Sequence, residues 1–326
     1  MIESNQTLQL PIARYRFIAQ VQTPLNLPDF AAATLRGAFG LALKSLVCLF
    51  GNRACSGCTL VQRCAYPAIF EVQAAPVSSD RMPQGVKRLA PYSIEIPHIP
   101  GGRRLAPGDR LEFDMVLTGR EVLKELPLII AAWQRALAGG LGKEMGKCRL
   151  ERVDYLADSQ ASRGIPVYSE AGQTVVAHSA ELCLPAFSST RNVNLHFLSP
   201  LRLVQRGQLI TLADLTPGVF LRHLIRRVNF QLGHELADWN GNQQVSLLNA
   251  QADAVNGETP AMTWQDWSRY STRQQQRMTF GGLLGHWLLS DVPVELQKIL
   301  YLGQWVHVGK ETAFGLGHYQ WLDSAG

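Results

Sequence analysis

Residues 91–119 read PYSIEIPHIPGGRRLAPGDRLEFDMVLTG. Apolar and polar residues alternate in PYSIEIP (91–97) and again in RLEFDMVLTG (110–119), a pattern typical of half-buried strands. The intervening IPGGRRLAPGD contains the Gly and Pro residues of a hairpin connection. We therefore expect two paired strands here, and this pair sets the frame for the first half of the chain.

Segments on either side of the pair complete one folding unit. IARYRFIAQVQ (12–22) alternates like a strand, and apolar residues at helical spacing predict a helix from about 28 to 50. An apolar helix at 121–138 and a strand at 148–156 follow the pair. The resulting order, β-α-β-β-α-β, is the ferredoxin-like or split βαβ arrangement.

The second half repeats this order more loosely, without a sequence repeat of fixed period. We expect a strand at 192–199, a helix at about 217–239, a strand pair within 262–271 and 279–290, a short helix at 293–302, and a final strand pair flanking a glycine-rich loop. The sequence thus predicts an α+β chain of two tandem ferredoxin-like domains. We place them at 1–160, with a cysteine-rich insertion, and at 173–326, joined near 158–172.

Composition limits the class of protein. Of 326 residues, 46% are hydrophobic and 17% are charged, so the chain can form packed cores and is not disordered throughout. A net charge of +5 favours a polyanionic partner, but suits an ordinary soluble protein equally well. Residues 1–10 lack the layout of a signal peptide, and no apolar run reaches the ~18 residues of a membrane span. We expect a cytoplasmic protein with no membrane partner.

The segment GQWVHVGKETAFGLGHYQW (303–321) is the most visible candidate for a binding site. Its glycines allow the backbone to bend sharply or another backbone to come close. Exposed N–H groups in such a loop can cradle phosphate oxygens, aided by a lysine and a hydroxyl group. The residues concerned are Gly309, Lys310, Thr312, Gly315 and Gly317. A simple turn before a terminal strand explains the same glycines.

The helix expected at about 217–239 carries a cluster of cations in the run LRHLIRRVNF. Arg222, Arg226 and Arg227 are expected on the face opposite an apolar stripe, with His223 beside them. Such a face is suited to binding phosphates, although a merely solvated face has the same pattern.

Four of the six cysteines fall within one loop. Cys48, Cys55, Cys58 and Cys64 have the spacing C-x6-C-x2-C-x5-C. Four thiolates so close in sequence fit a structural zinc site, and an iron–sulfur cluster takes four thiolates as well. Four reduced thiols without a metal are the remaining alternative.

Several segments together resemble the CRISPR-associated precursor-crRNA-processing endoribonuclease family of the RAMP superfamily. VHVGKETAFGLGHY (306–319) is similar to the family's C-terminal glycine-rich loop. The other matching segments are LRGAFG (35–40), YPAIFE (66–71), LSPLRLV (198–204), WQDWSRYSTRQ (264–274) and GGLLG (281–285). The resemblance spans most of the chain and implies ferredoxin-like domains of the RAMP or RRM-like type.

This resemblance implies a function. Family members bind a CRISPR repeat transcript and cut it within the repeat, without a metal ion, by attack of the ribose 2′-OH to leave a 2′,3′-cyclic phosphate. It implies CRISPR repeat RNA or crRNA as partner, other CRISPR effector subunits as further partners, and a prokaryotic cytoplasmic location. Arg269, Tyr270 and Arg273 lie in a matching segment and are expected to contact bases and phosphates.

The catalytic groups are harder to assign. Many family members place a histidine on or near the first helix, but no histidine occurs between Asp29 and Cys64. Arg36 and Lys44 lie on one side of that helix and are our candidates for stabilising the phosphorane, with His223 as the third candidate. They can equally be solvated cations of an amphipathic helix.

Two alternatives to a nuclease stay open. The missing first-helix histidine fits a non-catalytic crRNA-binding RAMP subunit of a CRISPR effector complex. A metal-stapled scaffold protein without an RNA role is the other alternative.

Overall fold

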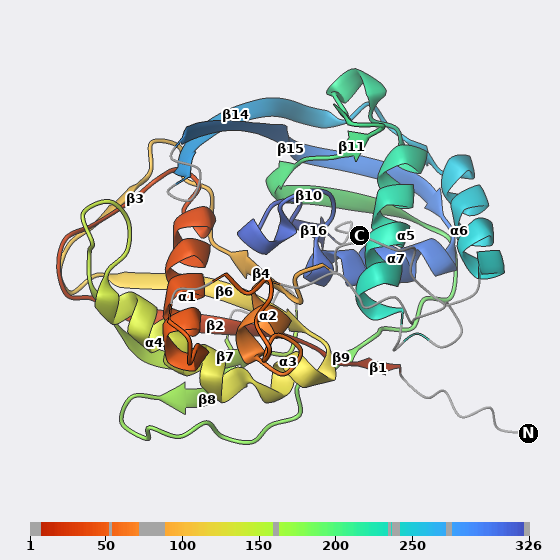
Figure 1. The fold of residues 1–326 in the computed structure, drawn as a ribbon. Coiled ribbons are helices and arrows are strands. Elements are labelled where there is room, and N and C mark those ends of the chain that lie inside the picture. The colour runs from red at the N-terminus through yellow and green to blue at the C-terminus, as the bar shows by residue number, and fades with distance from the viewer. Residues whose placement is uncertain are drawn as a thin grey trace, which may run out of the picture. The chain divides into compact units, whose positions relative to one another are not determined.

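The computed structural model describes residues 8–51, 54–71, 89–158, 163–233, 236, 242–271 and 276–322. It contains two compact units, here the N-terminal unit (Pro11–Ala180) and the C-terminal unit (Met1–Leu10 with Glu181–Gly326). Figure 1 shows a sheet and its helices in each. Strand β1 (Gln9–Leu10) pairs with β9 (Leu182–Cys183), so the first described residues join the C-terminal unit. Within the described ranges, no helix is long and apolar enough to cross a membrane.

The sheet of the N-terminal unit has the antiparallel order β4-β6-β2-β7-β8. Its strands are β2 (Ile12–Val21), β4 (Tyr92–Glu95), β6 (Arg110–Thr118), β7 (Cys148–Leu156) and β8 (Ile165–Ser169). The first and third strands of the β-α-β-β-α-β order, β2 and β6, lie in the middle, as they do in a ferredoxin-like sheet. The strand pair expected within 91–119 is β4 and β6.

Two helices, α1 (Ala32–Val47) and α4 (Leu126–Gly139), pack together against this sheet. Four aromatic side chains join the layers: Phe17 and Phe113 of the sheet, Phe39 of α1 and Trp133 of α4. The Trp133 ring lies 4.5 Å from Phe113 and 4.9 Å from Phe39, centroid to centroid. The shorter elements are β3 (Leu25–Leu27), paired with β5 (Arg103–Leu105), α2 (Ala65–Ile69) after the cysteine loop, and α3 (Arg120–Lys124).

The C-terminal unit repeats the topology. Its strands are β10 (Arg191–Leu201), β13 (Asn256–Gly257), β14 (Ala261–Ser271), β15 (Gln276–Val292) and β16 (Tyr319–Leu322). Strand β15 pairs with β10, which pairs with β16, while β13 and β14 both pair with β15. The first and third strands, β10 and β15, are again central. Two tandem ferredoxin-like units are thus confirmed.

Helices α5 (Pro217–Leu232), α6 (Asn242–Ala254) and α7 (Val294–Val306) belong to this unit. Phe220 of α5 packs on Phe197 and Trp287 of the sheet, with ring centroids 5.7 Å apart in both pairs. Between β10 and α5 lie a hairpin of β11 (Val204–Gln205) and β12 (Gln208–Leu209) and a turn of 3-10 helix, η1 (Leu212–Asp214).

The structure departs from the sequence expectations at several places. The helix expected at 121–138 is divided at Glu125 into α3 and α4, and helix α6 was not expected. Strand β8 lies inside the segment 158–172 that we expected to connect the domains. Helix α5 ends at Leu232, before the expected 239, and residues 234–235 and 237–241 lie outside the described ranges. The prediction of a strand before the glycine loop is wrong, because α7 continues through Trp305 to Val306. The apolar residues at the end of α7 fit both the helical period and the strand period. Their burial in the folded unit is what selects the helix.

Candidate nucleic-acid interface

The glycine-rich tail is a closely packed loop between α7 and β16. Gly309 has φ +95° and Gly317 has φ +68°, a region that other residues adopt at a cost. A Cβ atom on Gly309 would collide with the carbonyl oxygen of Arg202, and one on Gly317 with that of Val308. The glycines therefore let the loop lie directly against neighbouring backbone.

The end of β10 holds this loop through hydrogen bonds. The Lys310 N–H donates to the carbonyl of Arg202 at 2.9 Å, and the Gly317 N–H donates to the carbonyl of Pro200 at 3.0 Å. The buried Ser199 hydroxyl donates to the Gly315 carbonyl at 2.6 Å and accepts from the His318 N–H at 2.8 Å. Many of the N–H groups that we expected to cradle phosphate are thus used inside the fold. Thr312 is buried, whereas Lys310 is exposed.

The three arginines of α5 do not share one face. Arg226 is exposed, with its guanidinium 5.6 Å from the centroid of the Phe230 ring. Arg222 forms an ion pair with Asp253 of α6. Arg227 is buried, donates from Nε to the carbonyl of Val306 at 3.0 Å, and has its pKa lowered to about 10 by burial. The expected basic face is therefore wrong for Arg227, which caps the end of α7.

His223 lies between two backbone carbonyl groups. Its Nδ1 lies 2.9 Å from the carbonyl oxygen of Val219, and its Nε2 lies 3.1 Å from that of Val204. Both partners are carbonyl oxygens, which only accept hydrogen bonds, so each ring nitrogen faces an acceptor and a neutral ring, with its one N–H, can donate to one of them at a time. This geometry suits a residue that ties the β11–β12 hairpin to α5, and argues against a general base.

A pair of stacked histidines was missed by the sequence analysis. His196 of β10 and His286 of β15 are register partners, with ring centroids 4.1 Å apart and planes 4° apart. They alternate with the buried Phe197 and Trp287, and so lie on the sheet face opposite α5. Burial and the neighbouring His286 lower the pKa of His196. The alternation in LHFL (195–198) indicates that His196 points away from the core, but only the register of β10 with β15 places it beside His286.

The candidate cations on α1 lie among aromatic rings. The Arg36 guanidinium is 4.2 Å from the centroid of the Phe70 ring. Burial raises the pKa of Tyr92, and the Arg36 charge acts in the opposite direction and lowers it. The Lys44 ammonium is 5.4 Å from the centroid of Tyr66. Both residues belong to the N-terminal unit, whereas His223 belongs to the C-terminal unit.

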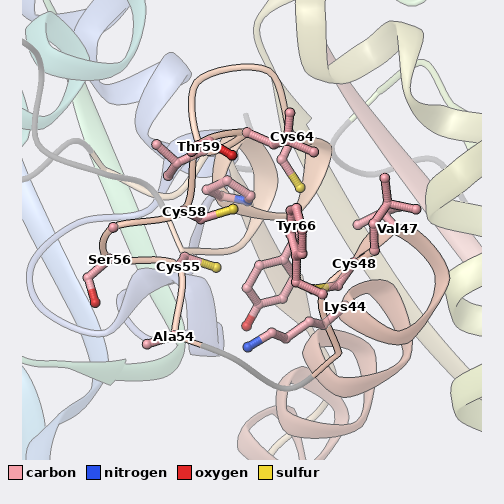
Figure 2. A pocket seen from close by; sticks show the side chains of 16 residues that line it. Lys44, Val47, Cys48, Ala54, Cys55, Ser56, Cys58, Thr59, Cys64 and Tyr66 are labelled. Atoms are coloured by element: carbon pink, nitrogen blue, oxygen red, sulfur yellow. The ribbon is translucent and has the colours of Figure 1, made fainter.

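The four clustered cysteines surround one cavity of about 460 Å³ in the N-terminal unit. Figure 2 shows their sulfur atoms turned toward a common space, with Lys44 at its edge. Burial raises the pKa of the Cys55 thiol, Glu71 raises it further, and Lys44 opposes the shift. The expected convergence of Cys48, Cys55, Cys58 and Cys64 on one site is compatible with this geometry.

The expected contacts on the β14–β15 hairpin are only partly described. Arg269 and Tyr270 lie on β14, in register with Met278 and Arg277 of β15, but their side chains lie outside the described residues. Arg273 lies outside them altogether.

Two family models match the chain. One, named AF_1859_N and described as an N-terminal domain, matches residues 10–180, close to the bounds of the N-terminal unit. The other, described as CRISPR-associated endoribonuclease Cas6, matches residues 195–319, from β10 to β16. An uncharacterized protein of Archaeoglobus fulgidus is 24% identical over 302 residues, which are 90% of this chain and 92% of that protein.

Solved structures with the same fold have low sequence identity. Thermus thermophilus Cas6 matches with a TM-score of 0.52 and 16% identity, over 96% of this chain and 99% of that one. A Cas6 product complex has a TM-score of 0.56 at 16% identity, covering 95% and 99% of the two chains. A chain of a partial Cas6-RT-Cas1–Cas2 complex matches with a TM-score of 0.57 at 16% identity, over 98% of this chain and 47% of that one. This chain therefore spans about half the length of that chain.

Proposed function

We propose that this chain is a member of the CRISPR-associated endoribonuclease Cas6 family, and that it binds CRISPR repeat RNA and cleaves it within the repeat. The observation that carries the proposal is the C-terminal unit, in which the family match coincides with the packed glycine loop. The RNA partner is a repeat transcript or its crRNA product.

Binding is supported by the exposed groups of the C-terminal unit. Lys310 extends from a loop whose backbone is held by Arg202 and Pro200, so its position is defined by the fold. Arg226 is exposed, with its guanidinium near the Phe230 ring, and His196 and His286 offer a stacked pair of rings. Cations are suited to phosphates and flat rings to unstacked bases. Arg269, Tyr270 and Arg273 remain proposed contacts on the hairpin.

The proposed reaction is transesterification. The ribose 2′-oxygen attacks the adjacent phosphorus, the bond to the 5′-oxygen breaks, and the products are a 2′,3′-cyclic phosphate and a 5′-hydroxyl end. A base removes the 2′-hydroxyl proton, an acid protonates the leaving oxygen, and cations stabilise the phosphorane. DNA lacks the nucleophile and is not a substrate.

Arg36 and Lys44 remain our candidates for the cations. Arg36 is held by a cation–π contact with Phe70, so its guanidinium is pre-oriented at little further entropic cost. His223 is proposed as a positioning residue, since backbone carbonyls face both of its ring nitrogens.

The second candidate function is a non-catalytic crRNA-binding subunit of an effector complex. It is favoured by the lack of any histidine between Asp29 and Cys64, which leaves the first helix without a conventional base. One of the similar solved structures is a Cas6-RT-Cas1–Cas2 complex, and we propose other CRISPR proteins as further partners of this chain.

One assay separates the two functions. Purified protein is incubated with labelled repeat RNA in EDTA, beside the same RNA with a single 2′-deoxy residue at the cut site. We expect cleavage of the first RNA, a cyclic phosphate end, and binding without cleavage of the second. Tight binding with no cleavage of either RNA, whether in EDTA or with added Mg²⁺, assigns the subunit role. Loss of cleavage in EDTA contradicts the metal-free mechanism, and cleavage of the deoxy RNA contradicts the 2′-OH attack.

A further inference from the structure

The cysteine loop has no hydrophobic core of its own. None of the described residues between Cys48 and Cys64 is buried, and Leu49 and Leu60 are exposed. The loop nevertheless has a defined path through successive turns, in which the Cys58 N–H donates to the Cys55 carbonyl at 3.1 Å and the Val61 N–H to the Cys58 carbonyl at 3.2 Å. A segment of this kind needs a staple to keep its shape.

The four thiols supply such a staple around one cavity. Cys48 caps the end of α1, Cys55 and Cys58 come from the turns, and Cys64 caps the start of α2. Lys44 is the single charged side chain among the described lining residues, and neither a carboxylate nor a histidine lines the cavity there. The donor set is therefore sulfur alone, which suits zinc or an iron–sulfur cluster.

The spacing of the sulfur atoms favours the cluster over zinc. In a tetrahedral zinc site with Zn–S bonds of roughly 2.3 Å, neighbouring sulfurs lie about 3.8 Å apart. Within the described part of the chain, no three of these cysteine sulfurs lie within 4.8 Å of one another, although all four line the same cavity. A four-iron cluster holds each thiolate on a different iron, so its ligands form a wider ring.

We propose that Cys48, Cys55, Cys58 and Cys64 ligate a four-iron, four-sulfur cluster in the cavity of about 460 Å³ that they surround. The Cys48 thiol, which contacts the Gly51 carbonyl oxygen at 2.8 Å, turns from that oxygen to iron as its thiolate. The cluster joins the end of α1 to the start of α2, and so holds Phe70 beneath Arg36 and against Gly40. All four iron positions have a protein ligand, so no iron is left open to bind a substrate, and the role proposed for the cluster is to hold the loop.

The test measures iron, zinc and acid-labile sulfide in the full-length protein after purification without oxygen, together with its visible spectrum. We expect about four iron and four sulfide per chain and a brown protein. Zinc at about one per chain without sulfide would overturn the proposal, as would the absence of both metals after reconstitution with iron and sulfide. None of these readouts depends on RNA cleavage, so they stand apart from the proposed function.

Substitution then locates the cluster. Cys55→Ser and Cys58→Ser are expected to lose the iron and the colour, whereas Cys183→Ser, at an exposed cysteine of β9, keeps both. Iron retained in full by either loop variant contradicts the assignment, and so does iron lost from the Cys183 variant. If the loop variants are insoluble, the iron, sulfide and zinc content of the wild-type protein decides alone.

Discussion

Replacing Ser199 by Ala removes one oxygen atom from the point where β10 holds the glycine loop. The hydroxyl donates to the Gly315 carbonyl and accepts from the His318 N–H, and the side chain is buried. Alanine fits the same space but leaves both backbone groups without this partner. Each buried group left unsatisfied costs about 1–3 kcal/mol, so we expect a loss of roughly 2–4 kcal/mol for the pair.

Thermal unfolding and RNA titration measure the consequences. For a unit of this size the loss corresponds to a fall in Tm of roughly 5–15 °C. The loosened loop should lower RNA affinity while the slope of log K against log salt stays unchanged, because no phosphate contact is removed. Lys310→Ala is the converse variant: its Tm should stay that of the wild type, while its salt slope falls by about 0.7–0.9.

Ser188→Ala, at an exposed serine of the same unit, is the matched control and should leave Tm and affinity unchanged. A Ser199 variant as stable as this control would refute the reasoning that the β10 end holds the loop. An unchanged salt slope for Lys310→Ala would refute the assignment of Lys310 to a phosphate.

The other predictions concern α5, α1 and the sheet. Arg226→Ala should lower the slope of log K against log salt for RNA binding by about 1 without changing Tm. Arg227→Ala should lower Tm and leave this slope unchanged, because that guanidinium is buried. Gly40→Ala should lower the free energy of unfolding by about 1–3 kcal/mol, because the added methyl group meets the Phe70 ring. Gly37→Ala, at an exposed position of the same helix, should raise the free energy of unfolding by about 0.5–1 kcal/mol. Urea denaturation measures both. The pKa of His196 is lowered in the folded state, so the unfolded state binds more protons below its ordinary value of 6.5. The free energy of unfolding should then fall as the pH drops through this range, and this dependence should weaken in His196→Phe.

Strong periodicity made much of the fold predictable. The strand at 148–156 was expected to the residue. The single helix expected at 121–138 corresponds to two helices, α3 and α4, which are separated at Glu125. The order of elements then determined the topology, since a β-α-β-β-α-β chain has few ways to pair its strands. The last turn of α7 was missed, because its apolar residues satisfy both periods and its neighbours decide between them.

Side-chain roles were less predictable, because they depend on partners distant in sequence. Arg226 and Arg227 are adjacent and alike in sequence, yet one is exposed and the other caps α7 through a carbonyl 79 positions away. The histidine pair depends on the register of β10 and β15, which no local pattern encodes. Helical spacing placed Arg36 and Lys44 on one side of α1, but it did not reveal the rings that hold them.

The packing of the glycine loop changes what its sequence pattern signifies. Gly309 and Gly317 meet backbone carbonyl oxygens so closely that no side chain fits, and Ser199 binds the loop at two points. A chain that loses catalysis still needs these residues in order to fold, so the pattern reports the architecture of the C-terminal unit. Cleavage is decided elsewhere, and a first helix with Arg36 and Lys44 but no histidine can stabilise the phosphorane without supplying a conventional base. If the chain cuts RNA, its rate measured against pH should therefore lack a titration near the ordinary pKa of histidine.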